Sequence, residues 1–424
     1  MILSDQFIST DMQPADRPAP IPKSKRIIDL DILRGVALFG ILVVNLQLFA
    51  HPLFSLITET GQFQEWYNQL AASFIHVFFE GKFITLFSFL FGIGFYIFAQ
   101  RLKLKEMSFY PVFLRRMGLL FFIGFLHAWL LWSGDILVPY AIGGLLLMLF
   151  FKRKDKTIKV WMGVLVGGMI LLFAVLMLLV MFAMNIPDVA EGITEGFVQQ
   201  ELEYAELTQR GYDVHESGSY SEIMAYRGEE RSFVWLGMLL SPAGLAYILA
   251  IFLFGLFIGR KGILDNPQAF RDYFIRNWKR NMLIGLPFSI FYAITYNYVN
   301  PIFFNYWYFL QIIAFFLGTP FLCFAYVGLI LKLIQKAGEG SWLSQFAPVG
   351  RMALTNYLMQ SVICTTIFSG YGLGFYGKLS PIMILPIAIV LFAFQVWFSR
   401  WYFTKFKMGP MERLWRMGTY LKRI

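Results

Sequence analysis

The chain has 424 residues, of which 58% are hydrophobic and only 15% charged, whereas a soluble protein carries roughly 25% charged residues. A soluble globular protein is therefore excluded. The formal net charge of +10 comes from basic residues clustered between apolar runs, a pattern typical of cytoplasmic membrane loops, so a nucleic-acid partner is disfavoured. Cys323 and Cys364 both lie in apolar segments and predict neither a disulfide framework nor a metal site.

Residues 1–31 are predicted to form a disordered cytoplasmic tail. They contain four prolines among polar residues and no continuous apolar core of the kind that a cleavable signal peptide needs. We therefore expect the first membrane helix to act as an uncleaved targeting signal.

Ten apolar runs follow, and a helix needs about 20 residues to cross the hydrocarbon core. Backbone groups in lipid must be satisfied internally, which predicts an all-α polytopic bundle. The predicted spans begin near Ile32, Ser73, Met117, Ile136, Val160, Phe233, Met282, Trp307, Met352 and Pro381. Five spans fill residues 32–184 and five fill residues 233–404.

Lys and Arg fall on alternate loops, which predicts both termini in the cytoplasm and a multi-pass protein of the cell membrane. The inside set includes residues 23–26, 101–116, 152–159, 260–280 and 332–351 and the basic tail 405–424. In that tail, Met411, Leu414, Trp415 and Leu421 predict an amphipathic helix at the interface.

Residues 185–232 form an acidic extracytoplasmic loop with eleven acidic and three basic residues. One interpretation is a solvated cap of one or two short helices. The other is a lid that selects an extracytoplasmic substrate.

Ionisable side chains inside hydrocarbon cost at least a few kcal/mol, so each one is a candidate functional residue. Toward the outer side these are His51, His76, Glu80, His127 and Asp135. His127 lies within its helix and Asp135 follows in the next turn, so the carboxylate could orient the imidazole as a general base. A histidine that only hydrogen-bonds to a neighbouring helix is the alternative.

Glu80 and Lys82 occupy one turn of the second span, and His76 shares a helix face with Glu80. They are interpreted either as part of a functional site or as a neutralised polar cluster that holds helices together. Glycine pairs at Gly163 with Gly167 and at Gly255 with Gly259 indicate close helix packing.

On the inner side, Asp31 and Arg34 open the first span, three residues apart on one face. Arg34, together with Arg115, Arg116 or Arg351, could bind the phosphates of a nucleotide-bearing ligand, because guanidinium matches phosphate bidentately. Membrane anchoring is the alternative role. In the ninth span, Asn356 and Gln360 project from one face and could line a polar tunnel or cross-link helices.

Three blocks resemble the YeiB-like membrane proteins of bacteria, a branch related to the heparan-alpha-glucosaminide N-acetyltransferases. They are residues 30–45 (LDILRGVALFGILVVN), 127–144 (HAWLLWSGDILVPYAIGG) and 350–366 (GRMALTNYLMQSVICTT), with a closing segment at 409–416 (GPMERLWR). Within the YeiB-like pattern, His127 and Asp135 belong to the matching motif. The likeness to the acetyltransferases rests on the first block and implies Asn45, with His51 as the nearest histidine, in an active site.

That resemblance implies a transmembrane acyltransferase that moves an acyl group from cytosolic acyl-CoA, such as acetyl-CoA, to a hydroxyl or amine at the outer face. The acceptor would be a small molecule or a glycan. No permanently bound cofactor is expected, and a homodimer in the lipid bilayer is compatible with the sequence. In this hypothesis Asn45 or Gln360 stabilises the oxyanion. A transporter of a small polar or lipid-linked solute is the alternative function, and a packing scaffold is a third.

Overall fold

The computed structural model describes residues 28–57, 63–241, 244–262, 264, 266–296, 299, 305–338 and 341–421. Within these ranges all regular structure is helical, which confirms the predicted all-α membrane bundle. The predicted disordered tail falls outside the described residues, apart from residues 28–31, which already form the first turn of a helix. Residues 422–424, the end of the predicted basic tail, also fall outside them.

The bundle consists of long helices joined by short turns. In chain order they are α1 (Ile28–Ala50), η2 (Leu53–Leu56), α2 (Trp66–Phe78), α3 (Lys82–Leu104), α4 (Phe109–Leu130), α5 (Leu137–Met148), α6 (Asp155–Ala183), α7 (Pro187–Ser217), α8 (Tyr220–Leu240), α9 (Leu245–Arg260), α10 (Pro267–Tyr296), α11 (Tyr306–Ala337), η4 (Trp342–Phe346), α12 (Ala347–Arg351), α13 (Ala353–Phe368), α14 (Pro381–Lys405) and α15 (Pro410–Tyr420).

Every predicted span coincides with a helix or a pair of helices in the described part of the chain. By length and composition, six stretches there can cross a membrane, and α5 and α9 are shorter apolar helices. The number of ten crossings and their orientation therefore stay predictions.

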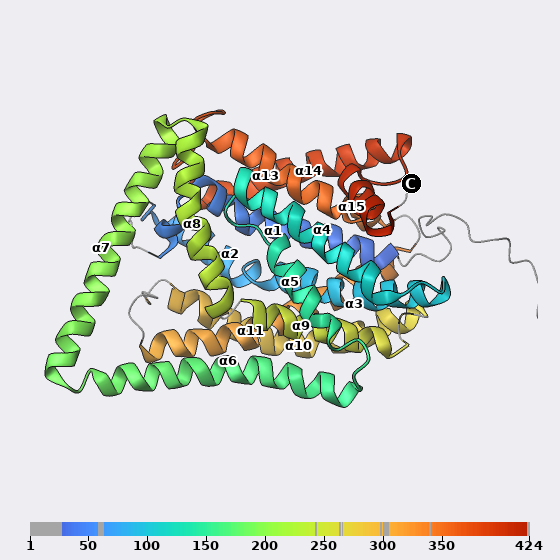
Figure 1. Ribbon diagram of the computed structural model, residues 1–424, viewed down its shortest axis with the longest axis horizontal. Coiled ribbons are helices and arrows are strands. Elements are labelled where there is room, and N and C mark those ends of the chain that lie inside the picture. The colour runs from blue at the N-terminus through green and yellow to red at the C-terminus, as the bar shows by residue number, and fades with distance from the viewer. Residues whose placement is uncertain are drawn as a thin grey trace, which may run out of the picture.

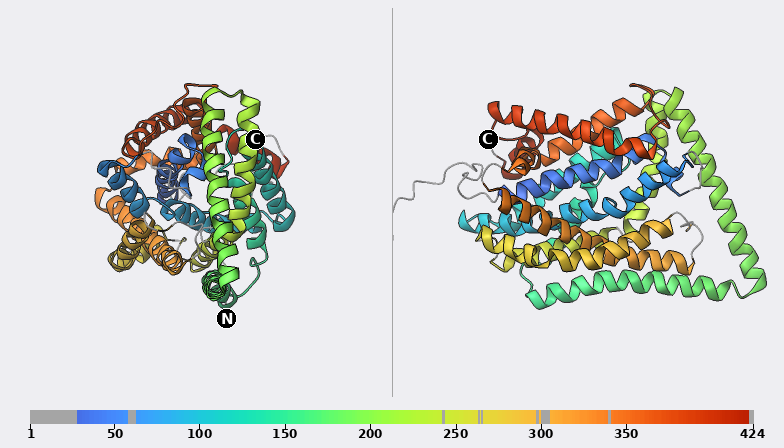
Figure 2. Two further views of the ribbon diagram at one scale, coloured as in Figure 1. Left: turned by 90° about the vertical axis from the view of Figure 1, so that its left-hand side faces the viewer. Right: turned by 180° about the vertical axis from the view of Figure 1, so that it is seen from behind.

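The two ends of the bundle differ in structure. The first turn of α1 and the whole of α15 lie at one end, while α7 crosses the opposite end and α6 runs along the outside (Figures 1 and 2). The acidic segment, for which one interpretation is a cap of one or two short helices, contains two long ones, the 31-residue α7 and most of the 21-residue α8, which continues beyond residue 232. Its capping box at Ser219 and Glu222 fixes the turn between them.

The second predicted span is not one helix but two. It is interrupted at residues 79–81, where Gly81 has a backbone φ of +76°. Residues with a Cβ rarely adopt this left-handed conformation. The ninth span is likewise divided at Met352, between α12 and α13. Both interruptions border the cavity described below.

Two helix crossings depend on glycine. A Cβ on Gly350 would lie 1.9 Å from the backbone oxygen of Asp31, and a Cβ on Gly255 would lie 2.3 Å from that of Phe89. The expected close packing at Gly255 is therefore found. The same expectation is wrong for Gly163 and Gly167, because no described atom lies within 4 Å of a Cβ built there and α6 is largely exposed.

We expect Gly350→Ala to destabilise the protein by about 1–3 kcal/mol, because the methyl group forces α12 away from α1. The measurement is the melting temperature in detergent, with Gly167→Ala as the matched control that meets open space. A melting temperature for Gly350→Ala equal to that of the control would contradict the tight crossing.

Candidate functional site

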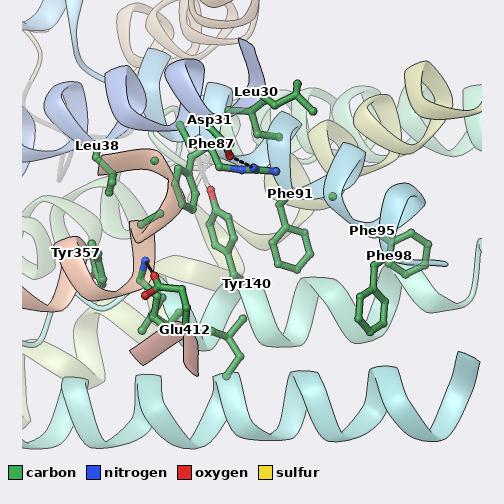
Figure 3. A pocket seen from close by; sticks show the side chains of 18 of the residues that line it. Leu30, Asp31, Leu38, Phe87, Phe91, Phe95, Phe98, Tyr140, Tyr357 and Glu412 are labelled. Atoms are coloured by element: carbon green, nitrogen blue, oxygen red, sulfur yellow. Dashed lines mark hydrogen bonds and ion pairs between the residues drawn. The ribbon is translucent and has the colours of Figure 1, made fainter. Parts of the chain in front are cut away.

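A cavity of about 1460 Å³ extends through the bundle from the end that carries α15. Side chains of α1, α3, α4, α5, α13 and α15 contribute to its lining (Figure 3). Its walls are mainly apolar, with Phe87, Phe91, Phe95 and Phe98 projecting from α3 and Tyr140 from α5. An extended apolar group of a ligand could therefore pack against the aromatic side chains of α3.

The charged residues that line this cavity are mostly cationic. Its basic members are Arg34, Arg101, Lys105, Arg116, Arg351, Lys407 and Arg416, against the acidic Asp31, Glu80 and Glu412. Arg34 pairs with Asp31 at 3.1 Å, and Arg116 lies close enough to Arg416, Arg101 and Arg34 for their charges to repel. Such a concentration of positive charge in a cleft favours an anionic ligand.

Helix α15 is fastened to the wall of the cavity by specific polar contacts. Glu412 accepts hydrogen bonds from the backbone N–H groups of Leu354 and Thr355, at 2.7 and 3.1 Å, and so caps the first turn of α13. Burial raises the pKa of Glu412, while these hydrogen bonds oppose the rise. The indole of Trp415 covers the Arg116 guanidinium at 3.6 Å and donates to the Arg116 backbone oxygen.

His127 and Asp135 form the buried pair that the sequence predicts. His127 Nδ1 lies 2.8 Å from Asp135 Oδ1, and Asp135 Oδ2 accepts a 2.7 Å hydrogen bond from the N–H of Val138. The second ring nitrogen of His127, Nε2, lies 2.7 Å from Ser361 Oγ. The pair is separated from the cavity by Tyr357, whose ring lies 5.2 Å from the His127 ring and also lines the cavity.

Glu80 contributes to the cavity lining where α2 and α3 are interrupted. It forms an ion pair with His76 and accepts a 3.0 Å hydrogen bond from the Tyr292 hydroxyl. Lys82 donates to the backbone oxygen of His76 at 2.8 Å. These contacts stabilise the interruption itself, because they hold groups from both sides of it.

The polar residues of α13 form interhelical hydrogen bonds with α14. Gln360 donates to Gln395 Oε1 at 2.9 Å, Asn356 donates to Ser399 Oγ at 3.1 Å, and Gln395 donates to the Asn356 backbone oxygen. Asn356 and Gln360 do not belong to the cavity lining described here, so their contacts match the cross-linking alternative. Asn45, by contrast, lines the cavity.

At the opposite end, α8 covers the last turn of α4. Arg227, Arg231 and Tyr220 donate hydrogen bonds to the backbone oxygens of Leu131, Ala128 and Leu130. Since these carbonyls end a helix and lack helical partners, α8 satisfies them. Glu230 accepts from the Ser133 hydroxyl and from the Leu53 N–H, both at 2.8 Å.

His51 and His215 belong to this covered end. His51 Nε2 lies 2.8 Å from the Leu379 backbone oxygen, and Nδ1 lies 3.1 Å from the Tyr212 hydroxyl. His215 stacks on Tyr376 with ring centroids 3.9 Å apart. Burial lowers the pKa of both histidines, that of His215 to about 3, helped by the nearby Arg227 charge.

The predicted residues thus fall into three groups. Arg34, Arg351, Asn45 and Glu80 line the cavity, and His127 with Asp135 lies one side chain behind it. His51, Asn356 and Gln360 lie elsewhere. Ser361 and Glu412 were not predicted as site residues, since their partners are far away in sequence and only the YeiB-like blocks pointed to these segments.

Comparison with known proteins gives a family but no chemistry. Residues 258–422 match the family described as "Protein of unknown function (DUF418)". The chain is 35% identical to uncharacterized protein YxaH of Bacillus subtilis (strain 168), over 95% of this chain and 96% of that protein. It is 27% identical to uncharacterized protein YeiB of Escherichia coli (strain K12), over 93% and 96%. No solved structure matches.

Acidification is expected to loosen the attachment of α7. The pKa of His215 is about 3 in the folded protein against 6.5 for an exposed histidine, so neutral His215 favours the attached state above pH 6.5. That contribution is lost progressively as the pH falls from 6.5 toward 3. Hydrogen–deuterium exchange of residues 205–217 should therefore accelerate between pH 7.5 and 5, after correction for the intrinsic pH dependence of exchange.

The variant His215→Phe keeps an aromatic ring against Tyr376 and should exchange with a smaller pH dependence. His51 has a pKa lowered in the same direction, so this variant isolates the contribution of His215. Equal pH dependence in the variant and the parent protein would contradict the assignment to His215.

Proposed function

The chain belongs to the YeiB-like, DUF418 family of membrane proteins, and from that premise we propose that it is a transmembrane acyltransferase. It takes an acyl group from acyl-CoA at the cytoplasmic face of a bacterial cell membrane and transfers it to a hydroxyl or amine acceptor at the outer face.

The cavity is the single observation that carries this proposal. It combines a cationic set of residues toward the α15 end with an aromatic wall along α3. A CoA thioester has the matching distribution, with several phosphate charges at one end and an acyl group at the other. Arg34 and Arg351 are the residues that we assign to the phosphates, because guanidinium groups bind phosphate oxygens bidentately.

His127 is the general base of the proposed reaction. Its Nδ1 contact with Asp135 leaves Nε2 to accept a proton, and the carboxylate stabilises the imidazolium that forms. Asn45 lines the cavity and is the candidate donor to the oxyanion, an interaction whose loss costs about 3 kcal/mol of barrier.

Transport of a small polar or lipid-linked solute is the second candidate function. The interrupted span α2–α3 supports it, because transporters commonly bind solutes at broken helices and Glu80 lines the cavity there. Proton-coupled transport would require flux in vesicles to follow a pH gradient. Acyl transfer requires no such dependence.

Acetyl-CoA should raise the melting temperature of the detergent-purified protein in a saturable way, because it binds the native state. The variants Arg34→Gln and Arg351→Gln should each weaken this binding about 10- to 100-fold, since a charge-assisted hydrogen bond contributes about 1.5–3 kcal/mol. Lys156→Gln, an exposed cation on α6, is the matched control. Equal melting temperatures with acetyl-CoA, with adenosine and without ligand would argue for the transport function.

The variant His127→Ala should lose transfer by about 100- to 10,000-fold while it keeps the acetyl-CoA-dependent shift, because general-base catalysis contributes that much. His51→Ala removes the other candidate histidine and should retain transfer. The measurement is the rate of thiol release with an acceptor mixture. Full activity in His127→Ala, or its loss only in His51→Ala, would refute the assignment of the base.

A further inference from the structure

Ser361 completes a three-residue hydrogen-bonded chain that the proposed reaction does not yet use. Its hydroxyl oxygen lies 2.7 Å from His127 Nε2, and His127 Nδ1 lies 2.8 Å from Asp135 Oδ1. All three residues are buried. They come from α13, α4 and the turn before α5, so the arrangement is produced by the fold and not by one local turn.

With Asp135 taken as a carboxylate, the contacts are consistent with one tautomer of His127. An ionised carboxylate can only accept, so the Nδ1 position carries the hydrogen that faces Asp135. Nε2 is then an acceptor, and the Ser361 hydroxyl donates to it. A nucleophile that donates to a base, which is oriented in turn by a third group, is the geometry that activates serine for covalent catalysis.

Asp135 is held in a fixed position by contacts at both of its carboxylate oxygens. Its second oxygen, Oδ2, accepts the Val138 N–H in the first turn of α5, where the helix dipole favours negative charge. Gly124 on α4 leaves room for it, because a Cβ there would lie only 3.0 Å from Oδ2.

The chain Asp135–His127–Ser361 lies between two spaces. Tyr357, one turn before Ser361 on α13, lines the cationic cavity. His127 itself lines a second groove of about 800 Å³ between α4, α13 and α15, which shares Trp415 with the cavity and whose other lining residues are almost all apolar, such as Phe122 and Leu126. A donor in the cavity and an acceptor that approaches along the groove would meet the same His127 from opposite sides.

We propose that Ser361 is the covalent acyl carrier of the reaction, which rests on the proposed acyltransferase function. The donor in the cavity and the acceptor in the groove occupy different spaces. A covalent carrier between the two spaces lets each substrate react in turn, so they need not meet at the same time. The acceptor in this scheme is an amphiphile whose hydrocarbon chain lies in the apolar groove.

The first half-reaction transfers the acyl group to the protein. Ser361 Oγ attacks the thioester carbon as its proton passes to His127 Nε2, so an Oγ–C bond forms and the C–S bond breaks. The proton on Nε2 then goes to the departing thiolate, which leaves CoA as the free thiol. Asp135 stabilises the transient imidazolium and keeps its own charge.

The second half-reaction is the mirror of the first. The acceptor hydroxyl or amine gives its proton to His127 Nε2 and attacks the acyl-serine carbon. A new O–C or N–C bond forms, the Oγ–C bond breaks, and Nε2 returns the proton to Ser361. No oxidant, reductant or further reactant is needed.

The test uses the purified full-length protein and acetyl-CoA labelled in the acetyl group, without acceptor. We expect a burst of about one free thiol per chain and acetyl label that stays on the denatured protein. Ser361→Ala should abolish both and slow overall transfer by at least about 1000-fold, with the acetyl-CoA-dependent thermal shift retained. Ser399→Ala, equally buried on α14, is the matched control and should behave as the parent.

The type of bond identifies the carrier. Label on Ser361 is an oxygen ester that survives neutral hydroxylamine, whereas the thioester of Ser361→Cys, or an acyl-histidine on His127, is cleaved by it. Normal transfer by Ser361→Ala, with no label on the parent protein, would overturn the carrier and leave the acyltransferase standing. Absence of acetyl-CoA binding and turnover in the parent protein would instead overturn the proposed function.

Discussion

The architecture depends on how a helical bundle in hydrocarbon accommodates charge. An ionisable side chain inside the bilayer is tolerated where it meets a partner or a water-filled space. In the described residues the first solution holds for His127 with Asp135, and for Glu80 with His76. The cations that line the large cavity are a different case, because seven basic residues share that lining with three acidic ones, although Arg34 pairs with Asp31 there. The excess of basic over acidic residues there, and not the number of charges, favours an anionic ligand.

The same constraint decided which features could be predicted from the sequence. Helices in lipid must be long and apolar, so the spans were visible as composition alone. His127 and Asp135 are eight residues apart across one turn, and their pairing followed from local geometry. Ser361 is 234 residues from His127, and no spacing rule connects residues over such a separation. The third member of that chain therefore required the tertiary structure.

The rotation of each helix about its own axis was the second property that the sequence could not predict. Asn356 and Gln360 share a face of α13, which the sequence gives reliably, but whether that face meets a tunnel or a neighbour depends on how α13 is rotated. It meets Gln395 and Ser399 of α14. Gly163 and Gly167 differ from Gly255 for the same reason, because α6 lies on the outside of the bundle and presents its glycines to no described neighbour.

The covered end of the bundle bears on the choice between transfer and transport. Three side chains of α8 satisfy the terminal carbonyls of α4, and Glu230 joins α8 to the turn that contains Ser133. A solute that left through this end would have to break all of these contacts in each cycle. Acyl transfer moves only a small acyl group past Tyr357 to the Ser361–His127 pair, and the cover over α4 can stay closed while it does so. The contacts of α8 therefore favour group transfer, and the interrupted span α2–α3 is the feature that a transport mechanism would have to use.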